Sequence, residues 1–103
     1  MIYHISKDDY EREVLNSSLP VVLDFYADWC GPCKAQGKIL ERIDPEFEGK
    51  IKICKSNVDE NPDFAEMFGI QTIPTLIFYK GGRKLGQYSG VLDKEGIKRM
   101  LEI

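Results

Sequence analysis

Apolar residues along the chain alternate between a strand-like and a helix-like spacing. Runs rich in β-branched and aromatic residues predict five strands, at residues 2–5, 21–27, 51–55, 75–79 and 84–89. Apolar positions three or four residues apart predict four helices: one near residues 7–17, a second that begins after Cys30, a third at residues 61–68 and a fourth at residues 93–101. Strands that alternate with helices favour a mostly parallel sheet that is covered on both faces.

The predicted fold class is α/β. We expect a five-stranded mixed sheet, made of parallel strands plus a C-terminal antiparallel hairpin, with four helices covering both faces. Gly81 and Gly82 fit the tight turn of that hairpin. The length of 103 residues suits one compact domain, so a single domain over residues 1–103 is expected.

Residues at the expected helix starts agree with the hydrophobic pattern. Ser6 is a typical N-cap, and Asp9 follows three residues later as its acidic partner. Asn61 with the proline after it predicts the start of the third helix, and Asp93 predicts the start of the fourth.

The second helix has a predicted buried face and two weak points. The residues expected on its buried face are Ala35, Ile39, Leu40, Ile43 and Phe47. Gly37 costs roughly 1 kcal/mol relative to alanine in a helix interior. Pro45 should kink or end the helix near Asp44.

The run at residues 21–27 is apolar almost throughout, which predicts a strand buried on both faces. Asp24 interrupts this run. A buried carboxylate costs free energy unless it has a partner or a function, and the loss of hydration would raise its pKa. The alternative is that Asp24 lies at a bent strand end and faces water.

Composition and charge argue against several classes of partner. Hydrophobic residues make up 43% and charged residues 30% of the chain, and the net charge is −3 without any block of like charge. Neither nucleic acid nor a membrane surface is therefore expected as a partner. The N-terminus lacks the features of a signal peptide, and residues 21–27 are too few to span a bilayer, so we expect a cytoplasmic location.

Two of the three cysteines, Cys30 and Cys33, lie at the junction between a predicted strand and a predicted helix. A helix N-terminus favours the reactive thiolate form of a cysteine. One helical turn places both residues on the same face, so a small adjustment closes a disulfide. The placement favours redox chemistry over a structural zinc site, for which Cys54 and His4 would have to converge on the pair. No metal is expected.

The segment around the two cysteines resembles the active-site signature of the thioredoxin family. That signature reads Trp29-Cys30-Gly31-Pro32-Cys33-Lys34. The resemblance continues in order through Asp24-Phe25, Asn57-Val58-Asp59, Asn61-Pro62, Gly69-Ile70, Ile73-Pro74-Thr75 and Gly90. It implies the thioredoxin fold and a protein-disulfide reductase that maintains cell redox homeostasis.

The resemblance implies roles for four residues in the reaction. Cys30 would be the nucleophile that attacks a client disulfide, and Cys33 would resolve the mixed disulfide. Asp24 would act as the proton shuttle for Cys33, with Lys55 as the nearby cation that tunes it.

The resemblance also implies a surface that binds client proteins. Its residues would be Trp29, Gly31, Pro32, Ile73, Pro74 and Gly90. The Ile73-Pro74 bond is expected to be cis and to face the disulfide, and the backbone of Ile73 would pair with an extended client segment. Trp29 is equally compatible with a simple packing role.

Three positions differ from the usual family pattern or lie outside it. Lys38 stands where many thioredoxins carry a proline, so we expect a helix kink that is shifted or softer. Tyr26 stands where many relatives carry tryptophan. Cys54 is expected to be a small buried hydrophobe, with a regulatory or dimer-forming thiol as the alternative.

The expected function is the reduction of disulfides in client proteins by a monomer that needs no cofactor. A thioredoxin reductase is the expected electron donor. The Gly31-Pro32 dipeptide resembles that of the reducing members of the family. Two other functions stay open at this point: disulfide formation or isomerisation by the same chemistry, and a binding module that works without redox activity.

Overall fold

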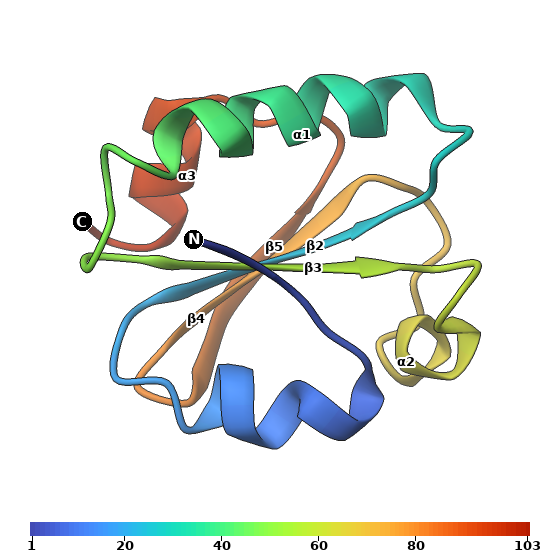
Figure 1. The fold of residues 1–103 in the computed structure, drawn as a ribbon, viewed down its shortest axis with the longest axis horizontal. Coiled ribbons are helices and arrows are strands. Elements are labelled where there is room, and N and C mark those ends of the chain that lie inside the picture. Colours follow the sequence, from blue (N-terminus) through green and yellow to red (C-terminus); the bar gives the residue numbers. More distant parts are fainter.

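A computed structural model describes residues 1–103. The chain forms a five-stranded sheet with helices on both faces, as Figure 1 shows. The strands are β1 (Ile2–His4), β2 (Val21–Tyr26), β3 (Lys52–Asn57), β4 (Thr75–Lys80) and β5 (Arg83–Ser89). The helices are η1 (Lys7–Asp9), η2 (Glu11–Leu15), α1 (Gly31–Ile43), α2 (Pro62–Met67) and α3 (Lys94–Met100). The predicted α/β class and the five strands are confirmed.

Strand β2 lies at the centre of the sheet, whose order is β1-β3-β2-β4-β5. Side chains alternate along β2 and so contribute to two separate cores. Val21, Leu23 and Phe25 belong to the core on the side of η2 and α2. Val22 belongs to the core on the side of α1 and α3. The residues of β2 up to Phe25 are at most 1% exposed, which confirms a strand buried on both faces.

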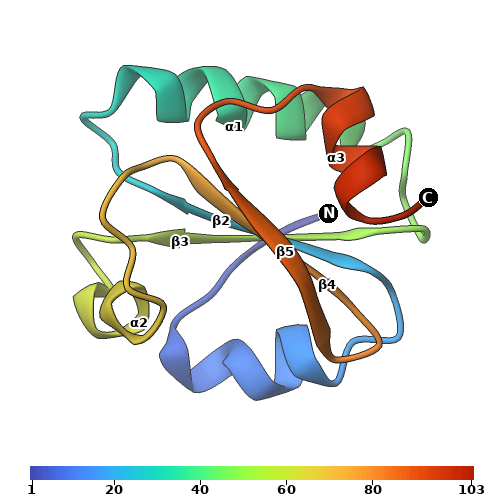
Figure 2. The same cartoon turned by 180° about the vertical axis from the view of Figure 1, so that it is seen from behind.

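The sheet is mixed, which confirms the expected set of parallel strands plus a C-terminal antiparallel hairpin. β1, β3 and β2 are parallel neighbours, whereas β4 is antiparallel to both β2 and β5. The connection from β3 to β4 contains only the six-residue α2, which lies beyond one end of the sheet in Figures 1 and 2. Because α2 does not cross a face of the sheet, the chain re-enters from the end at which it left, and β4 runs the opposite way.

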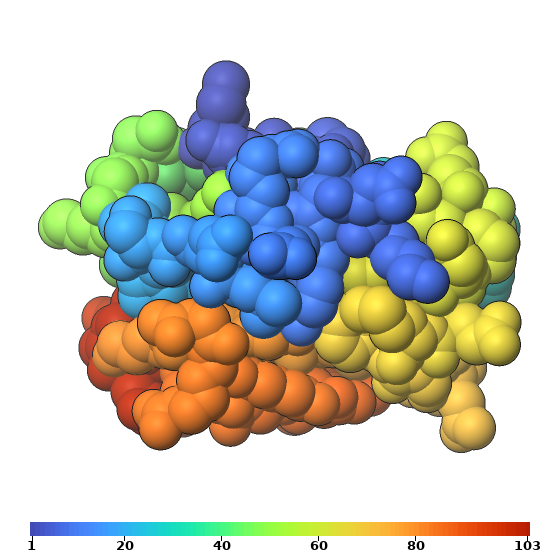
Figure 3. All heavy atoms as spheres, turned by 90° about the horizontal axis from the view of Figure 1, so that it is seen from below, coloured from blue at the N-terminus to red at the C-terminus, as the bar shows by residue number.

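The helix expected at residues 7–17 is present, but it is not a regular α-helix. It consists of the 3₁₀ helix η1 and the π-helix η2, which meet at Tyr10. Ser6 begins it as predicted, and its backbone N–H donates to Asp9 Oδ2 at 2.9 Å. The Tyr10 hydroxyl lies 2.7 Å from the Tyr79 hydroxyl, and its ring packs edge-on against α2. We attribute the irregular geometry to these tertiary contacts. Figure 3 shows this segment covering the face opposite α1.

Helix α1 ends at Ile43, before Pro45, as the proline predicts. The expected buried face is partly wrong. Ala35 is exposed, whereas Gln36 and Gly37 are buried. Hydropathy alone favours alanine over glutamine for the inner face. The pattern could not reveal that the backbone of Leu92 hydrogen-bonds the buried glutamine.

The predicted caps of α2 and α3 act differently. Asp93 caps α3 as expected, because its Oδ1 accepts a hydrogen bond from the Gly96 N–H at 2.9 Å. Asn61 occupies the N-cap position of α2, but its side chain makes no capping hydrogen bond.

None of the helices has the length and hydrophobicity that crossing a lipid bilayer would need.

Candidate functional site

The two cysteines lie where the central strand β2 passes into α1. Cys30 is the N-cap residue of α1, and its Sγ accepts a hydrogen bond from the Cys33 backbone N–H at 3.2 Å. Pro32 lies in the first turn, where the missing N–H leaves no helical hydrogen bond unmade. The two cysteines form a disulfide, with their Cα atoms 5.2 Å apart. The predicted pairing across one helical turn is therefore present.

Exposure hardly distinguishes the two cysteines in the disulfide form. Cys30 is 5% exposed and Cys33 is 3% exposed. Their surroundings differ more. Cys30 Sγ lies 3.8 Å from the carbonyl oxygen of Ile73, whereas Cys33 lines a pocket together with Lys55.

Trp29 places an apolar ring at the surface next to Cys30, with 71% of the residue exposed. Its Nε1 donates to Asp59 Oδ2 at 2.8 Å, and the Asp59 N–H donates to Asn57 Oδ1 at 2.8 Å. The indole is thus oriented by a hydrogen bond at its edge and is not buried as a packing residue. Asp59 was not among the predicted site residues, because the sequence does not reveal a contact between side chains 30 positions apart.

The loop before β4 brings Ile73 and Pro74 beside Cys30. The Ile73-Pro74 peptide bond is cis, as the resemblance implies. Ile73 makes no backbone–backbone hydrogen bond through its N–H or its carbonyl group. Gly90 joins the same region, because its N–H donates to the Pro74 carbonyl oxygen at 2.8 Å. Gly90 has φ +113°, a conformation that side-chain-bearing residues rarely adopt.

Asp24 is fully buried in β2, with Lys55 of β3 and Leu76 of β4 as its neighbours across the sheet. Neither of its carboxylate oxygens makes a hydrogen bond. Burial raises the pKa of Asp24 to about 7, and the Lys55 cation offsets only part of that increase. The alternative of a water-facing Asp24 is therefore wrong. A carboxyl group that titrates near neutral pH is suited to proton transfer.

Lys55 extends from β3 towards α1. Its Nζ lies 4.4 Å from the ring centroid of Tyr26, a cation–π distance. A Cβ atom on Gly37 would come within 3.3 Å of this Nζ, so the glycine that weakens α1 leaves room for the cation. Cys33, Lys55 and Gly37 help to line an open pocket of about 350 Å³, which brings solvent to the inner side of the disulfide.

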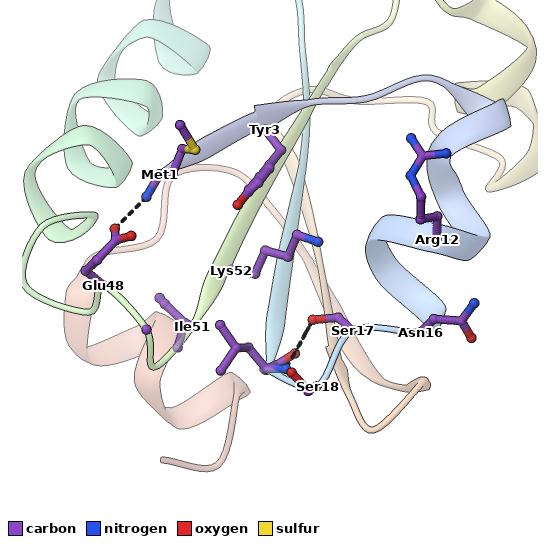
Figure 4. A pocket seen from close by; sticks show the side chains of 11 residues that line it. Met1, Tyr3, Arg12, Asn16, Ser17, Ser18, Glu48, Ile51 and Lys52 are labelled. Carbon is purple, nitrogen blue, oxygen red and sulfur yellow. Dashed lines mark hydrogen bonds and ion pairs between the residues drawn. The ribbon is translucent and has the colours of Figure 1, made fainter.

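Another pocket of about 350 Å³ lies at the opposite end of the sheet, where the parallel strands begin (Figure 4). Its lining includes Met1, Tyr3, Arg12, Asn16, Ser17, Ser18, Glu48, Ile51 and Lys52. Its two cations, Arg12 and Lys52, are already paired with Glu13. Arg12 Nε lies 3.0 Å from Glu13 Oε2, and Lys52 Nζ lies 2.5 Å from Glu13 Oε1. The pocket contains no cysteine or histidine, and we assign it no chemistry.

The remaining cysteine and the single histidine do not form part of a reactive cluster. Cys54 is fully buried in the core, and burial raises the pKa of its thiol to about 12, so it stays protonated at neutral pH. His4 lies on β1 and contacts the edge of the Tyr26 ring. The chain gathers no group of three or more His, Cys, Asp or Glu side chains that could hold a metal ion.

Comparison with known proteins agrees with this geometry. The family model described as Thioredoxin matches residues 1–103. Thioredoxin 1 of Nostoc sp. is 42% identical over 98 residues, which cover 95% of this chain and 92% of that protein. The thioredoxin of Haemophilus influenzae is 45% identical over 93 residues, which cover 90% of this chain and 87% of that protein. The chain carries a C-x-x-C pair that forms a disulfide, and it reduces protein disulfides by thiol–disulfide exchange. The chain belongs to the thioredoxin family.

Proposed function

We propose that the protein is a cytoplasmic protein-disulfide reductase in which Cys30 is the nucleophile and Cys33 is the resolving thiol. The observation that carries this assignment is the position of Cys30 at the N-cap of α1, where the Cys33 N–H donates to its sulfur at 3.2 Å. A thiolate at Cys30 would accept the same hydrogen bond and would lie at the positive end of the helix dipole. Both effects favour the reactive form of Cys30.

The reaction consists of two thiol–disulfide exchanges. First, the Cys30 thiolate attacks one sulfur of a client disulfide. A bond forms between Cys30 and the client, and the other client sulfur leaves as a thiolate. Next, Cys33 loses its proton and attacks Cys30, so that the bond to the client breaks and the second client sulfur leaves as a thiolate. The client gains two electrons, and the protein is left with the disulfide between Cys30 and Cys33.

In this proposal, Asp24 accepts the proton that Cys33 loses in the second exchange. Its buried carboxyl group has a pKa of about 7, so both the acid and the base form are present at neutral pH. The Lys55 cation favours the ionised form, and it therefore increases the fraction of Asp24 that can accept a proton. Cys33 and Lys55 line the same open pocket, which places this cation near the thiol that loses the proton.

We further propose that clients bind across a surface next to Cys30. Its residues are Trp29, Gly31, Pro32, Ile73, Pro74 and Gly90. Two observations support this surface. The backbone groups of Ile73 are free to pair with an extended client segment, and Gly90 leaves its side of the surface without a side chain.

Each turnover leaves the protein oxidised, so a donor must return two electrons to it. We propose a flavin- and NADPH-dependent thioredoxin reductase as that donor, with the protein acting as a monomer. The Gly31-Pro32 dipeptide, which resembles that of reducing family members, supports the reductive direction. The net charge of −3 gives no reason to propose nucleic acid or a membrane surface as a partner.

Cysteine variants test the two thiol roles. Cys30→Ser should reduce insulin only at the background rate, because it lacks the attacking thiol. Cys33→Ser should accumulate a mixed disulfide with insulin, because the second exchange cannot occur, and mass spectrometry under non-reducing conditions would detect the adduct. Cys54→Ala is the matched control and should keep its turnover, since Cys54 is fully buried away from the disulfide.

Near-normal turnover by Cys30→Ser would contradict the nucleophile assignment. A Cys33→Ser variant that reduces insulin without any covalent adduct would remove the resolving role.

A further inference from the structure

Gln36 is a fully buried amide on the inner face of α1, one turn after Cys33. Both polar ends of its side chain bind the same residue. Its Nε2 donates to the Leu92 carbonyl oxygen at 3.0 Å, and its Oε1 accepts from the Leu92 N–H at 2.7 Å. Gln36 therefore holds the backbone of Leu92 in the way that a neighbouring strand would.

Leu92 belongs to the connection between β5 and α3, which Figure 2 shows passing over α1 before α3 begins. We call residues 90–92 the clamp segment. Its first residue is also fixed, because the Gly90 N–H donates to the Pro74 carbonyl oxygen at 2.8 Å. The clamp segment is thus tied to the cis-proline loop at one end and to α1 at the other.

Between these two hydrogen-bonded ends, the clamp segment is exposed and has backbone groups without a hydrogen-bond partner. Val91 is 40% exposed and makes no backbone–backbone hydrogen bond. The carbonyl group of Gly90 also has no backbone partner. The Leu92 side chain, in contrast, packs against the core shared by α1 and α3.

We propose that Gln36 is a positioning residue for client binding. By fixing Leu92, it holds Gly90 and Val91 in the orientation in which they form one wall of the client surface. Because Gln36 and Cys33 lie on the same helix, the clamp also keeps this wall in register with the disulfide. The inference rests on the proposed function, in which clients bind beside the cis-proline loop.

A purely apolar residue at position 36 would fill the same space but would leave both backbone groups of Leu92 without their partner. The clamp segment would then regain conformational freedom. A client protein would have to order the segment on binding, which weakens its interaction without altering the chemistry at Cys30. A small disulfide that needs no such wall would not sense the difference.

The test compares Gln36→Met with Ile43→Val. Ile43 is also buried on α1, and shortening it removes packing but no hydrogen bond. Each pre-reduced variant is mixed with insulin or with hydroxyethyl disulfide, and the single-turnover rate is followed by the fluorescence of Trp29. We expect Gln36→Met to react several-fold more slowly with insulin but within about twofold of the original rate with hydroxyethyl disulfide. Ile43→Val should keep both rates.

Equal losses with both disulfides would overturn the inference, because Gln36 would then act on the dithiol itself. An unchanged insulin rate in folded Gln36→Met would also overturn it. Failure of the original protein to reduce either disulfide would refute the proposed function and the proposed role of Gln36 together.

Amide hydrogen exchange in the original protein adds a test that needs no variant. The Leu92 N–H should be protected from exchange like the amides of α1. Rapid exchange would show that its hydrogen bond to Gln36 Oε1 does not form in solution.

Discussion

At the scale of single residues, Asp24 opposes folding while it serves the proposed reaction. The carboxyl group is fully buried and makes no hydrogen bond, and its pKa is raised to about 7. Between its unfolded pKa near 3.8 and its folded pKa, the folded protein binds more protons than the unfolded chain. The free energy of unfolding therefore falls as the pH rises through this window and levels off above it.

Asp24→Asn should remove this pH dependence. The pKa shift corresponds to a decrease of roughly 4 kcal/mol in the free energy of unfolding of the original protein between pH 4 and pH 8. We expect the free energy of unfolding of the variant, relative to that of the original protein, to increase as the pH rises through this window. The variant should also turn over more slowly, because it lacks the proposed proton shuttle. Urea unfolding of the oxidised forms at a series of pH values measures the first effect. Parallel pH profiles for the two proteins would contradict the buried, titrating carboxyl group.

At the scale of secondary-structure elements, two helices that look alike in sequence begin differently in the structure. Asn61 and Asp93 are both N-cap residues. Only Asp93 makes a capping hydrogen bond, to the Gly96 N–H. Asn61 instead donates a long hydrogen bond of 3.4 Å to the Asn57 carbonyl oxygen. The identity of a capping residue predicts where a helix starts, but not how much the cap stabilises it.

A matched pair of alanine variants tests this difference. Asp93→Ala should lower the free energy of unfolding by about 1 kcal/mol, because it leaves an N–H at the start of α3 without its partner. Asn61→Ala should cost less than about 0.5 kcal/mol, since no capping bond is lost. Urea unfolding of both variants provides the measurement. An equal or larger loss for Asn61→Ala would show that its side chain caps α2 in solution.

The hydrophobic pattern predicted some features of the secondary-structure elements and not others. Strand β2 was predictable because its apolar run needs burial on both faces, and the end of α1 was predictable from Pro45. The buried Gln36 was not predictable, since its partner is the backbone of a residue 56 positions away. The antiparallel pairing of β4 with β5 was predictable from the Gly81-Gly82 turn, whereas the antiparallel pairing of β4 with β2 follows from where α2 lies.

At the scale of the whole molecule, the fold gathers separate segments around one disulfide. The cysteines follow β2, the cis-proline loop precedes β4, and Gly90 follows β5. The two cysteines and their signature were readable from the sequence because they are local. The hydrogen bond between Trp29 and Asp59, and the room that Gly37 leaves for Lys55, needed the structure because they join different elements.

The measurement that tests the central claim most directly is the reduction potential of the disulfide between Cys30 and Cys33. Equilibration of the protein with dithiothreitol and glutathione buffers would determine it. We expect a strongly reducing value, close to the potential of about −270 mV that is typical of thioredoxin. A value near about −120 mV, typical of a strong disulfide-forming oxidase, would reverse the proposed direction of electron flow and contradict the assignment as a reductase.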